Sequence, residues 1–227
     1  MSSGTNTQSV RINANGAWIE GDLGVPDDAR GVVLFAHGSG SSRFSPRNRF
    51  VAEVLNSAKV ATLLVDLLTS EEERIDERTA ELRFDIGLLA ERVVAATDAL
   101  VTDPTVRHLP VGLFGASTGA AAALVAAAER PNTVRAVVSR GGRPDLAGPA
   151  LRHVRSPTLL IVGGEDDVVI ELNQEALGEL QCEKRLVIIP RATHLFEEPG
   201  ALENVSRVAR EWFVTHLPRT AAAEARA

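Results

Sequence analysis

The sequence contains very few of the residues that staple small secreted proteins or build thiolate metal sites. Its 227 residues include one cysteine, Cys182, one methionine and no tyrosine. A single cysteine cannot form an intrachain disulfide, so folding does not depend on an oxidising compartment. The chain is long enough to bury a core without such staples. We therefore interpret Cys182 as an incidental thiol.

The chain also lacks an excess of basic residues. Its 24 lysines and arginines are outnumbered by 30 aspartates and glutamates, which gives a net charge of −6. This sign is unfavourable for a protein that grips phosphate backbones, so we expect no nucleic-acid partner. Met1–Gln8 have neither a basic start nor an apolar stretch. With no visible secretory signal, we expect a cytoplasmic protein.

No apolar run has the composition of a membrane span. Val111–Ala128 comes nearest, with eighteen residues and no charge, which reaches the lower limit for a spanning helix. Glycine and hydroxyl residues divide this stretch into a short strand, a turn and an alanine-rich helix. The sequence therefore predicts a buried strand-turn-helix unit and no membrane partner.

Short apolar runs alternate with helical patterns along the chain. Runs without alternation predict strands buried on both faces: Gly31–Ala36, Val60–Val65, Val111–Phe114, Val134–Val138, Thr158–Val162 and Leu186–Ile189. Apolar residues at three- and four-residue steps predict helices over Phe50–Ala58 and Ile86–Leu100, with a last helix from Pro199 to Pro218. Strands that alternate with helices predict a mostly parallel sheet covered on both faces.

The two ends and one acidic stretch have weaker patterns. Ser9–Ile12 and Ala17–Val25 flank a turn signal and predict an N-terminal antiparallel hairpin. Ser70–Glu81 is rich in glutamate and predicts a solvated loop or short helix. We expect residues 1–8 and 218–227 to be disordered.

The sharpest local pattern is Gly115-Ala116-Ser117-Thr118-Gly119, a G-x-S-x-G between an apolar strand and a helix. This is the general pattern of a nucleophile elbow, in which a serine lies on a sharp strand-to-helix turn. Glycine two positions on either side of Ser117 removes Cβ atoms that would collide with neighbouring backbone. The alternative is a glycine-rich turn that needs small residues only for close packing.

A serine hydroxyl becomes a good nucleophile when a base takes its proton and a third group orients that base. These groups should follow later strands, because ligands in open α/β sheets gather at the carboxyl ends of the strands. Asp166 follows the run 158–162, and His194 follows the run 186–189. Ser117, Asp166 and His194 therefore stand in the chain order expected after such an elbow.

With these motifs the chain resembles the α/β-hydrolase superfamily, and most closely its small, lidless dienelactone-hydrolase-like members. The resemblance covers residues 9–217, and it implies a single α/β-hydrolase domain without a large lid. In this family the acid lies in a G-x-x-D-x-x-V pattern, which Gly163, Asp166 and Val169 match. The founding enzymes use a cysteine nucleophile, and the serine at position 117 is a departure from them.

We weigh other acids and histidines against Asp166 and His194. Glu165 and Asp167 remain alternatives for the orienting acid. Otherwise they are solvated neighbours of Asp166. The family's histidine loop, just before the last helix, matches His194. Three other histidines fit that loop poorly and are expected in surface or packing roles: His108, His153 and His216.

The resemblance also implies two backbone donors for the oxyanion of an acyl-transfer reaction. One is the N–H of Thr118, the residue after the nucleophile. The other is the N–H of Ser39, in a loop His37–Arg43 that is similar to the family's HG-x-G segment. His37 then has a structural role. A phosphate cradle is the alternative for this loop, but the G-x-x-x-x-G-K-[ST] spacing is missing.

A pair of arginines follows the strand at 134–138. Arg140 and Arg143 should lie on the same rim as Ser117, where a guanidinium fork is suited to a substrate carboxylate. With Arg43 they would make this rim more cationic than the total charge suggests. The alternative is an internal ion pair with a partner among Asp145, Asp166 and Asp167.

We therefore expect a serine hydrolase of small carboxylic esters or thioesters, without metal or cofactor. An acyl-enzyme forms on Ser117, His194 acts as general base and acid, and Asp166 orients His194. The alternatives are a ligand-binding or interaction module with a vestigial triad, and an acyltransferase that uses the same pocket. We expect a monomer or homodimer.

The chain also resembles the hydrolase half of proteins named as phosphoribosyltransferase/hydrolase fusions. Nothing in the sequence is similar to the pyrophosphate-binding loop of a phosphoribosyltransferase. We therefore do not carry that activity over to this chain.

Overall fold

The strands of the sheet coincide with the apolar runs of the sequence. A computed structural model describes residues 4–218 and contains an eight-stranded sheet. Every residue of β3, β4, β5 and β7 is buried, as expected for strands covered on both faces. The strands are β1 (Thr5–Ala14), β2 (Ala17–Pro26), β3 (Gly31–Ala36), β4 (Val60–Val65), β5 (Val111–Ala116), β6 (Val134–Arg140), β7 (Thr158–Gly163) and β8 (Lys184–Ile189).

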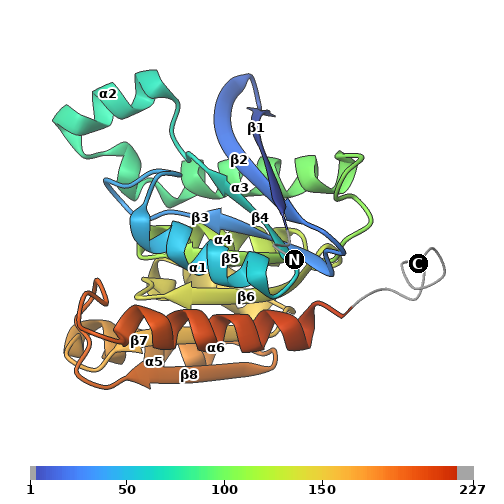
Figure 1. Cartoon of the computed structure of the whole chain (residues 1–227). Coiled ribbons are helices and arrows are strands. Elements are labelled where there is room, and N and C mark those ends of the chain that lie inside the picture. The colour runs from blue at the N-terminus through green and yellow to red at the C-terminus, as the bar shows by residue number, and fades with distance from the viewer. Residues whose placement is uncertain (1–3, 219–227) are drawn as a thin grey trace.

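Helices form a layer on each face of this sheet. Figure 1 shows α1 and α6 on one face and α3, α4 and α5 on the other. A separate cluster of buried apolar side chains lies under each layer. The helices are α1 (Pro46–Ser57), α2 (Ser70–Thr79), α3 (Ile86–Thr102), α4 (Thr118–Glu129), α5 (Asp167–Glu179) and α6 (Ala201–His216), with 3₁₀ helices η1 (Leu82–Phe84) and η2 (Pro144–His153).

The strand order brings one end of every parallel strand to a common edge. The order is β1-β2-β4-β3-β5-β6-β7-β8. β1 and β2 pair antiparallel, as do β2 and β4, and the other pairs are parallel. The predicted α/β-hydrolase fold is therefore confirmed, with its mostly parallel sheet and N-terminal hairpin. The residues that follow β5, β7 and β8 meet at the carboxyl edge, as the sequence predicted.

The N-terminal hairpin is longer than expected. Asn15 and Gly16 form its two-residue turn, and both have positive φ, 52° and 92°, as a type I′ turn requires. Thr5–Gln8 were expected to be disordered, but they form the first part of β1 and pair with residues 23–26 of β2. Ladder hydrogen bonds to β2 order this polar segment without burying it. Most of the other residues that were expected to be disordered, within 1–8 and 218–227, lie outside the described residues.

Two helical segments differ in detail from their prediction. The acidic stretch forms α2, and Thr69 caps its first turn. The Thr69 side chain accepts a hydrogen bond from the Glu72 N–H, and the Glu72 side chain accepts one from the Thr69 N–H. The last helix begins at Ala201 rather than Pro199, because Gly200 has φ 81° and lies outside the helical region. No helix within residues 4–218 is long and apolar enough to cross a bilayer.

Candidate active site

Ser117 lies on a strained turn between β5 and α4. Its φ is 49° and its ψ is −121°, a backbone conformation that costs free energy for a residue with a side chain. Close packing holds the turn: a Cβ on Gly115 would lie 2.4 Å from Ala120 Cα, and one on Gly119 would lie 2.3 Å from the carbonyl oxygen of His37. The two glycines therefore allow the backbone to come close enough to present Ser117 at the edge of the sheet.

The loop after β3 packs directly against this turn. A Cβ on Gly38 would lie 2.9 Å from Ser117 Cβ. Both ring nitrogens of the buried His37 are engaged: Nε2 accepts a hydrogen bond from the Leu67 N–H at 3.0 Å, and Nδ1 lies 2.9 Å from the Gly38 carbonyl oxygen. This pattern requires a neutral ring with its proton on Nδ1. Burial lowers the pKa of His37, which favours the same neutral form. His37 therefore fastens the loop to the end of β4.

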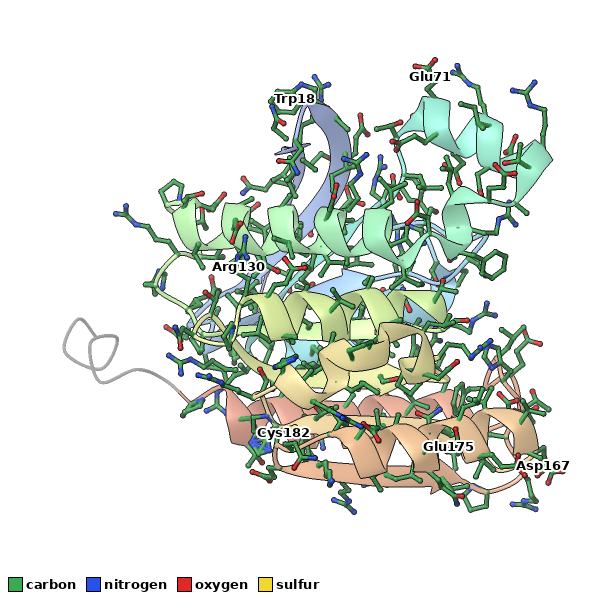
Figure 2. All side chains as sticks on the ribbon, turned by 180° about the vertical axis from the view of Figure 1, so that it is seen from behind. Trp18, Glu71, Arg130, Asp167, Glu175 and Cys182 are labelled. Carbon is green, nitrogen blue, oxygen red and sulfur yellow. The ribbon has the colours of Figure 1, made fainter. Side chains whose placement is uncertain are left out.

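Asp166 and His194 are hydrogen-bonded across the ends of neighbouring strands. Asp166 Oδ2 lies 2.6 Å from His194 Nδ1, a short distance typical of a charge-assisted bond. β7 and β8 pair in parallel, so the loops that follow them carry the two side chains to the same place. This bond turns Nε2 into the free nitrogen of the His194 ring. The alternative acids Glu165 and Asp167 are both exposed, and Figure 2 shows Asp167 at the start of α5.

Ser117 and His194 each lie beside the end of β6. Ser117 N–H donates to the Arg140 carbonyl oxygen at 3.2 Å. The next residue, Gly141, has φ 50°, and a Cβ there would lie 3.6 Å from His194 Cε1. Within residues 4–218 no hydrogen bond joins the Ser117 hydroxyl to the His194 ring. Contacts of this kind are often loose without substrate and tighten when it binds.

The two candidate oxyanion donors lie on either side of the elbow. Thr118 is the first residue of α4, where backbone N–H groups have no acceptor inside the helix and the helix dipole favours negative charge. Ser39 follows Gly38, which contacts the elbow, and its N–H donates no hydrogen bond within the part of the chain that the structure describes. Both residues line one cavity. The arrangement is suited to a negatively charged oxygen near Ser117.

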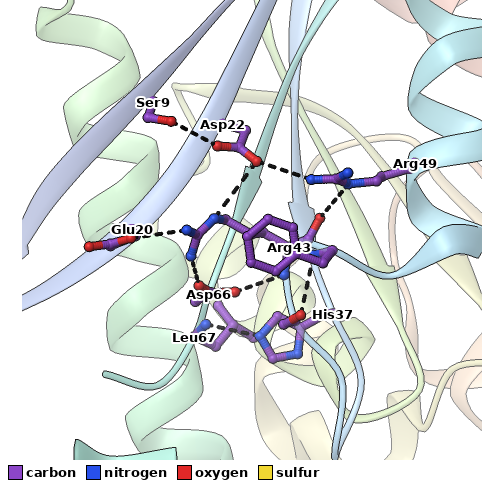
Figure 3. Close-up of polar contacts among 10 residues, drawn as sticks. Ser9, Glu20, Asp22, His37, Arg43, Arg49, Asp66 and Leu67 are labelled. Carbon is purple, nitrogen blue, oxygen red and sulfur yellow. Dashed lines mark hydrogen bonds and ion pairs between the residues drawn. The ribbon is translucent and has the colours of Figure 1, made fainter. Parts of the chain in front are cut away.

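Arg43 is part of a charge network and is not a free cation on the rim. Figure 3 shows Arg43 among Glu20 and Asp22 of β2 and Asp66, which follows β4. Its guanidinium group contacts the Asp66 carboxylate, Glu20 at 3.0 Å and Asp22 at 3.7 Å. The backbone N–H of Arg43 also donates a hydrogen bond to Asp66 Oδ1, at 2.7 Å. These bonds fix the far end of the loop that carries Ser39.

The other two arginines differ in their surroundings, one paired with a carboxylate and the other buried. Arg143 makes two hydrogen bonds to Asp145, at 2.9 and 2.7 Å, which is the internal pairing that the sequence left open. Arg140 is only 9% exposed and donates to Asn48 Oδ1 at 3.3 Å. Burial, and then the charge of Arg47, lower the pKa of Arg140 to about 10. These contacts do not favour the expected cationic rim.

No local pattern in the sequence indicated an acidic wall beside the elbow. A cavity of about 270 Å³ lies between the His37–Ser41 loop and the α2–η1 segment. Its charged lining residues are Asp66, Glu73, Asp76, Glu77 and Arg83. Except for Asp66, these residues belong to the acidic stretch Ser70–Glu81, or, in the case of Arg83, follow it closely. Thr69 and Glu72 form a capping box, the one signal that could have defined the helix.

The remaining candidate residues lie away from this edge. Cys182 is partly buried beside Thr158, with its sulfur 3.7 Å from the Thr158 hydroxyl. Burial raises the pKa of this thiol, which makes it a poor nucleophile. His216, in α6, packs edge-on against Trp212 with ring centroids 4.3 Å apart. Within residues 4–218 no group of three or more His, Cys, Asp and Glu side chains is arranged to hold a metal ion.

Comparison with known proteins identifies chains that share this fold. The chain is 64% identical to a dienelactone hydrolase from Anabaena variabilis, with a TM-score of 0.92 over 94% of this chain and 99% of that one. Est1E from Butyrivibrio proteoclasticus shares the fold at 16% identity, with a TM-score of 0.77 over 92% of this chain and 98% of that one.

The chain is also 58% identical, over 92% of its length, to two Mycobacterium tuberculosis proteins that are provisionally named phosphoribosyl transferases. It spans 46% of their length, so about half of each relative has no counterpart here. The dienelactone hydrolase family model matches residues 21–216. A hydrolase is the class of protein that these matches support, and the chain belongs to the dienelactone hydrolase family.

Proposed function

We propose that this chain is a serine hydrolase that cleaves a small carboxylic ester or thioester through an acyl-enzyme on Ser117. The observation that carries the proposal is the 2.6 Å contact between His194 Nδ1 and Asp166. It fixes the ring so that Nε2 is free to accept a proton. The strained elbow, which presents Ser117 at the same edge, supplies the nucleophile.

The first half of the reaction forms the acyl-enzyme. Ser117 Oγ attacks the carbonyl carbon while its proton passes to His194 Nε2. The N–H groups of Ser39 and Thr118 donate hydrogen bonds to the oxyanion as charge develops on it. When the tetrahedral intermediate collapses, the bond to the alcohol or thiol breaks, and the leaving group takes the proton from Nε2.

The second half restores the enzyme. A water molecule loses its proton to His194 Nε2 and attacks the acyl carbon. Collapse of the second tetrahedral intermediate breaks the bond to Ser117 Oγ, which regains the proton, and the carboxylic acid departs. Asp166 stabilises the imidazolium in both halves and remains ionised.

The direct experiment is hydrolysis of a panel of chromogenic esters of different acyl length, with wild type and Ser117→Ala. We expect turnover by wild type, loss of turnover in Ser117→Ala, and an acyl adduct on rapidly quenched wild type in the mass spectrum. A wild type that binds esters without turnover would support the second candidate, a binding module with a vestigial triad. Products with an added alcohol, in preference to water, would instead indicate an acyltransferase that uses the same pocket.

Two names among the relatives bear on substrate choice. The Anabaena variabilis relative is named a dienelactone hydrolase, and we include a lactone in the panel for that reason. The phosphoribosyl transferase name of the longer relatives is not proposed for this chain, because nothing in it is similar to a pyrophosphate-binding loop.

A further inference from the structure

The cavity beside the elbow adjoins the proposed reaction centre through Thr118, the residue after Ser117. Its lining includes Gly38–Ser41 and Thr118, and therefore both candidate oxyanion donors. The opposite wall is formed by α2 and Arg83 of η1. At about 270 Å³ the cavity is large enough for a short side chain of a substrate whose carbonyl group lies against Ser39 and Thr118.

This wall carries more negative charge than its positive groups balance. Asp76 is only 3% exposed and accepts hydrogen bonds from Arg83 N–H at 2.9 Å and Arg83 Nε at 2.6 Å. Asp66 is bound by Arg43. Glu73 and Glu77 have no ion-pair partner within residues 4–218. Two carboxylates on one side of the cavity are therefore free for a ligand.

The free carboxylates experience mutual repulsion. Partial burial raises the pKa of Glu73, and the negative charges of Asp66, Glu77 and Asp76 raise it further, with Arg83 opposing. A carboxylate with a raised pKa is less stable in its charged form than the same group in water. A cation placed between Glu73 and Glu77 would relieve this repulsion.

A second polar group in the cavity also lacks a partner. Thr118 is 2% exposed, and its hydroxyl oxygen has no hydrogen bond within the described part of the chain. Buried hydroxyl groups in native proteins are nearly always hydrogen-bonded. Thr118 lines the cavity, so a ligand that donates a hydrogen bond would satisfy it. This observation is independent of the charges on α2.

The chemistry of the lining selects the kind of cation. Quaternary ammonium groups are recognised by the faces of Trp, Tyr and Phe rings, and the described residues that line the cavity include none of these three. Carboxylates and a hydroxyl oxygen accept hydrogen bonds, which a primary ammonium or a guanidinium group donates. The apolar lining residues Leu67, Leu68 and Leu89 are suited to the methylene stem of such a group.

We propose that this cavity is a subsite for a primary ammonium or guanidinium group on the substrate of the proposed ester hydrolysis, and the inference therefore rests on that proposed function. The preferred substrates are esters that carry a positive charge a few methylene groups from the scissile bond. This is opposite in sign to the carboxylate that the sequence suggested for Arg140 and Arg143, of which Arg143 is paired with Asp145 and Arg140 is buried.

The test compares esters that differ only in charge. One series has the charge in the acyl group: 4-nitrophenyl 6-aminohexanoate, its neutral isostere 4-nitrophenyl heptanoate, and the anionic 4-nitrophenyl monoester of adipic acid. A second series has it in the leaving group: 4-(aminomethyl)phenyl acetate against 4-ethylphenyl acetate. We expect kcat/KM for the cation to exceed that for the neutral isostere about tenfold or more in at least one series.

Variants locate the effect on α2. Glu73→Gln and Glu77→Gln should each lower the cation-to-neutral ratio of kcat/KM about three- to tenfold, and the double variant should lower it further. The ratio is measured on one preparation, so partial misfolding cancels. Glu71→Gln is the matched control and should leave the ratio unchanged. Glu71 lies on the same helix (Figure 2) but is not one of the residues that line the cavity.

The outcomes separate the two proposals. Absence of hydrolysis of every ester, neutral ones included, would contradict the proposed function. Hydrolysis of the neutral esters with a ratio near one in both series, or with the anion preferred, would overturn the subsite alone. A wild-type preference that survives Glu73→Gln/Glu77→Gln would overturn its placement on α2. Loss of the preference at high salt in wild type would support it, because these carboxylates are exposed.

Discussion

Asp166 Oδ2 lies 2.6 Å from His194 Nδ1, and the two residues follow adjacent parallel strands, β7 and β8. The pairing register therefore determines their separation, and neither loop has to fold independently to bring them together. A side chain positioned by neighbouring strands keeps its geometry during a reaction better than one carried by a long loop. This relationship leads to the first prediction.

Asp166→Asn should lower kcat for ester hydrolysis about 10³- to 10⁴-fold, because an amide does not stabilise the imidazolium and favours the wrong tautomer of His194. Steady-state kinetics with a neutral chromogenic ester measure the effect. Asp167→Asn, one residue along and exposed, is the control and should change kcat less than about twofold. Equal losses in both variants would place the orienting acid elsewhere.

Gly119→Ala should destabilise the protein by about 3 kcal/mol or more, because the new Cβ meets the backbone oxygens of His37 at 2.3 Å and Ala36 at 2.4 Å. Gly178→Ala is the contrasting control: no atom lies within 4 Å of its added Cβ, and alanine favours the helix by about 0.5–1 kcal/mol. Urea unfolding measures both. A stable Gly119→Ala variant would contradict the packing described for the elbow.

His37 should make stability depend on pH. Burial places its folded pKa below the unfolded value of 6.5, so its contribution is fully present above the unfolded pKa and is lost as pH falls below it. The loss is at most about 1.4 kcal/mol for each pH unit between the two pKa values. Urea unfolding between pH 7 and pH 5 should show a smaller fall for His37→Gln than for wild type.

His216 is the other histidine to control for in that experiment. Burial lowers its pKa, with the charge of Glu183 opposing, so it contributes in the same direction. His216→Gln should remove a separate part of the fall. A wild-type free energy of unfolding that does not change from pH 7 to pH 5 would show that neither ring is held in its neutral form.

Arg140→Met should raise the free energy of unfolding by about 1–3 kcal/mol, because it removes a buried charge that has no carboxylate partner. Arg140 Nε and Nη1 make no hydrogen bond within residues 4–218. Arg143→Met, which breaks the partly exposed pair with Asp145, should instead lower it by no more than about 1 kcal/mol. Thermal unfolding of both variants decides between these directions.

The same two variants test whether Arg140 or Arg143 binds a carboxylate group of the substrate. If Arg140 or Arg143 holds such a group, its variant should lose activity on an anionic ester relative to a neutral one. We expect that ratio to stay unchanged in both, because the internal contacts occupy Arg143 and bury Arg140.

The sequence predicted the sheet and the elbow well because both are encoded locally. A short apolar run such as Val60–Val65 is typical of a strand buried on both faces. The strand β4 begins and ends at the same two residues. Ser117 lies between two glycines whose spacing already implies a tight turn. Asp166 and His194 then followed from the rule that parallel strands end at a common edge.

The features that the sequence did not predict depend on contacts distant along the chain. Asp76 is buried because Arg83 binds it, and Glu72 pairs with Arg92 of α3, so the inward side of α2 is polar and shows no apolar stripe. Arg43 is bound by Glu20 of β2 and by Asp66, which follows β4, and no local pattern connects these residues. The acidic wall and the charge network of Arg43 have this same cause.

The most direct test of the central claim is labelling by a fluorophosphonate, which modifies a serine only when a base activates it. We expect intact-protein mass spectrometry to show one adduct on wild type, which peptide mapping places on Ser117. Ser117→Ala should show none, and His194→Ala should label far more slowly. An unlabelled wild type, or an adduct on another residue, would contradict the account.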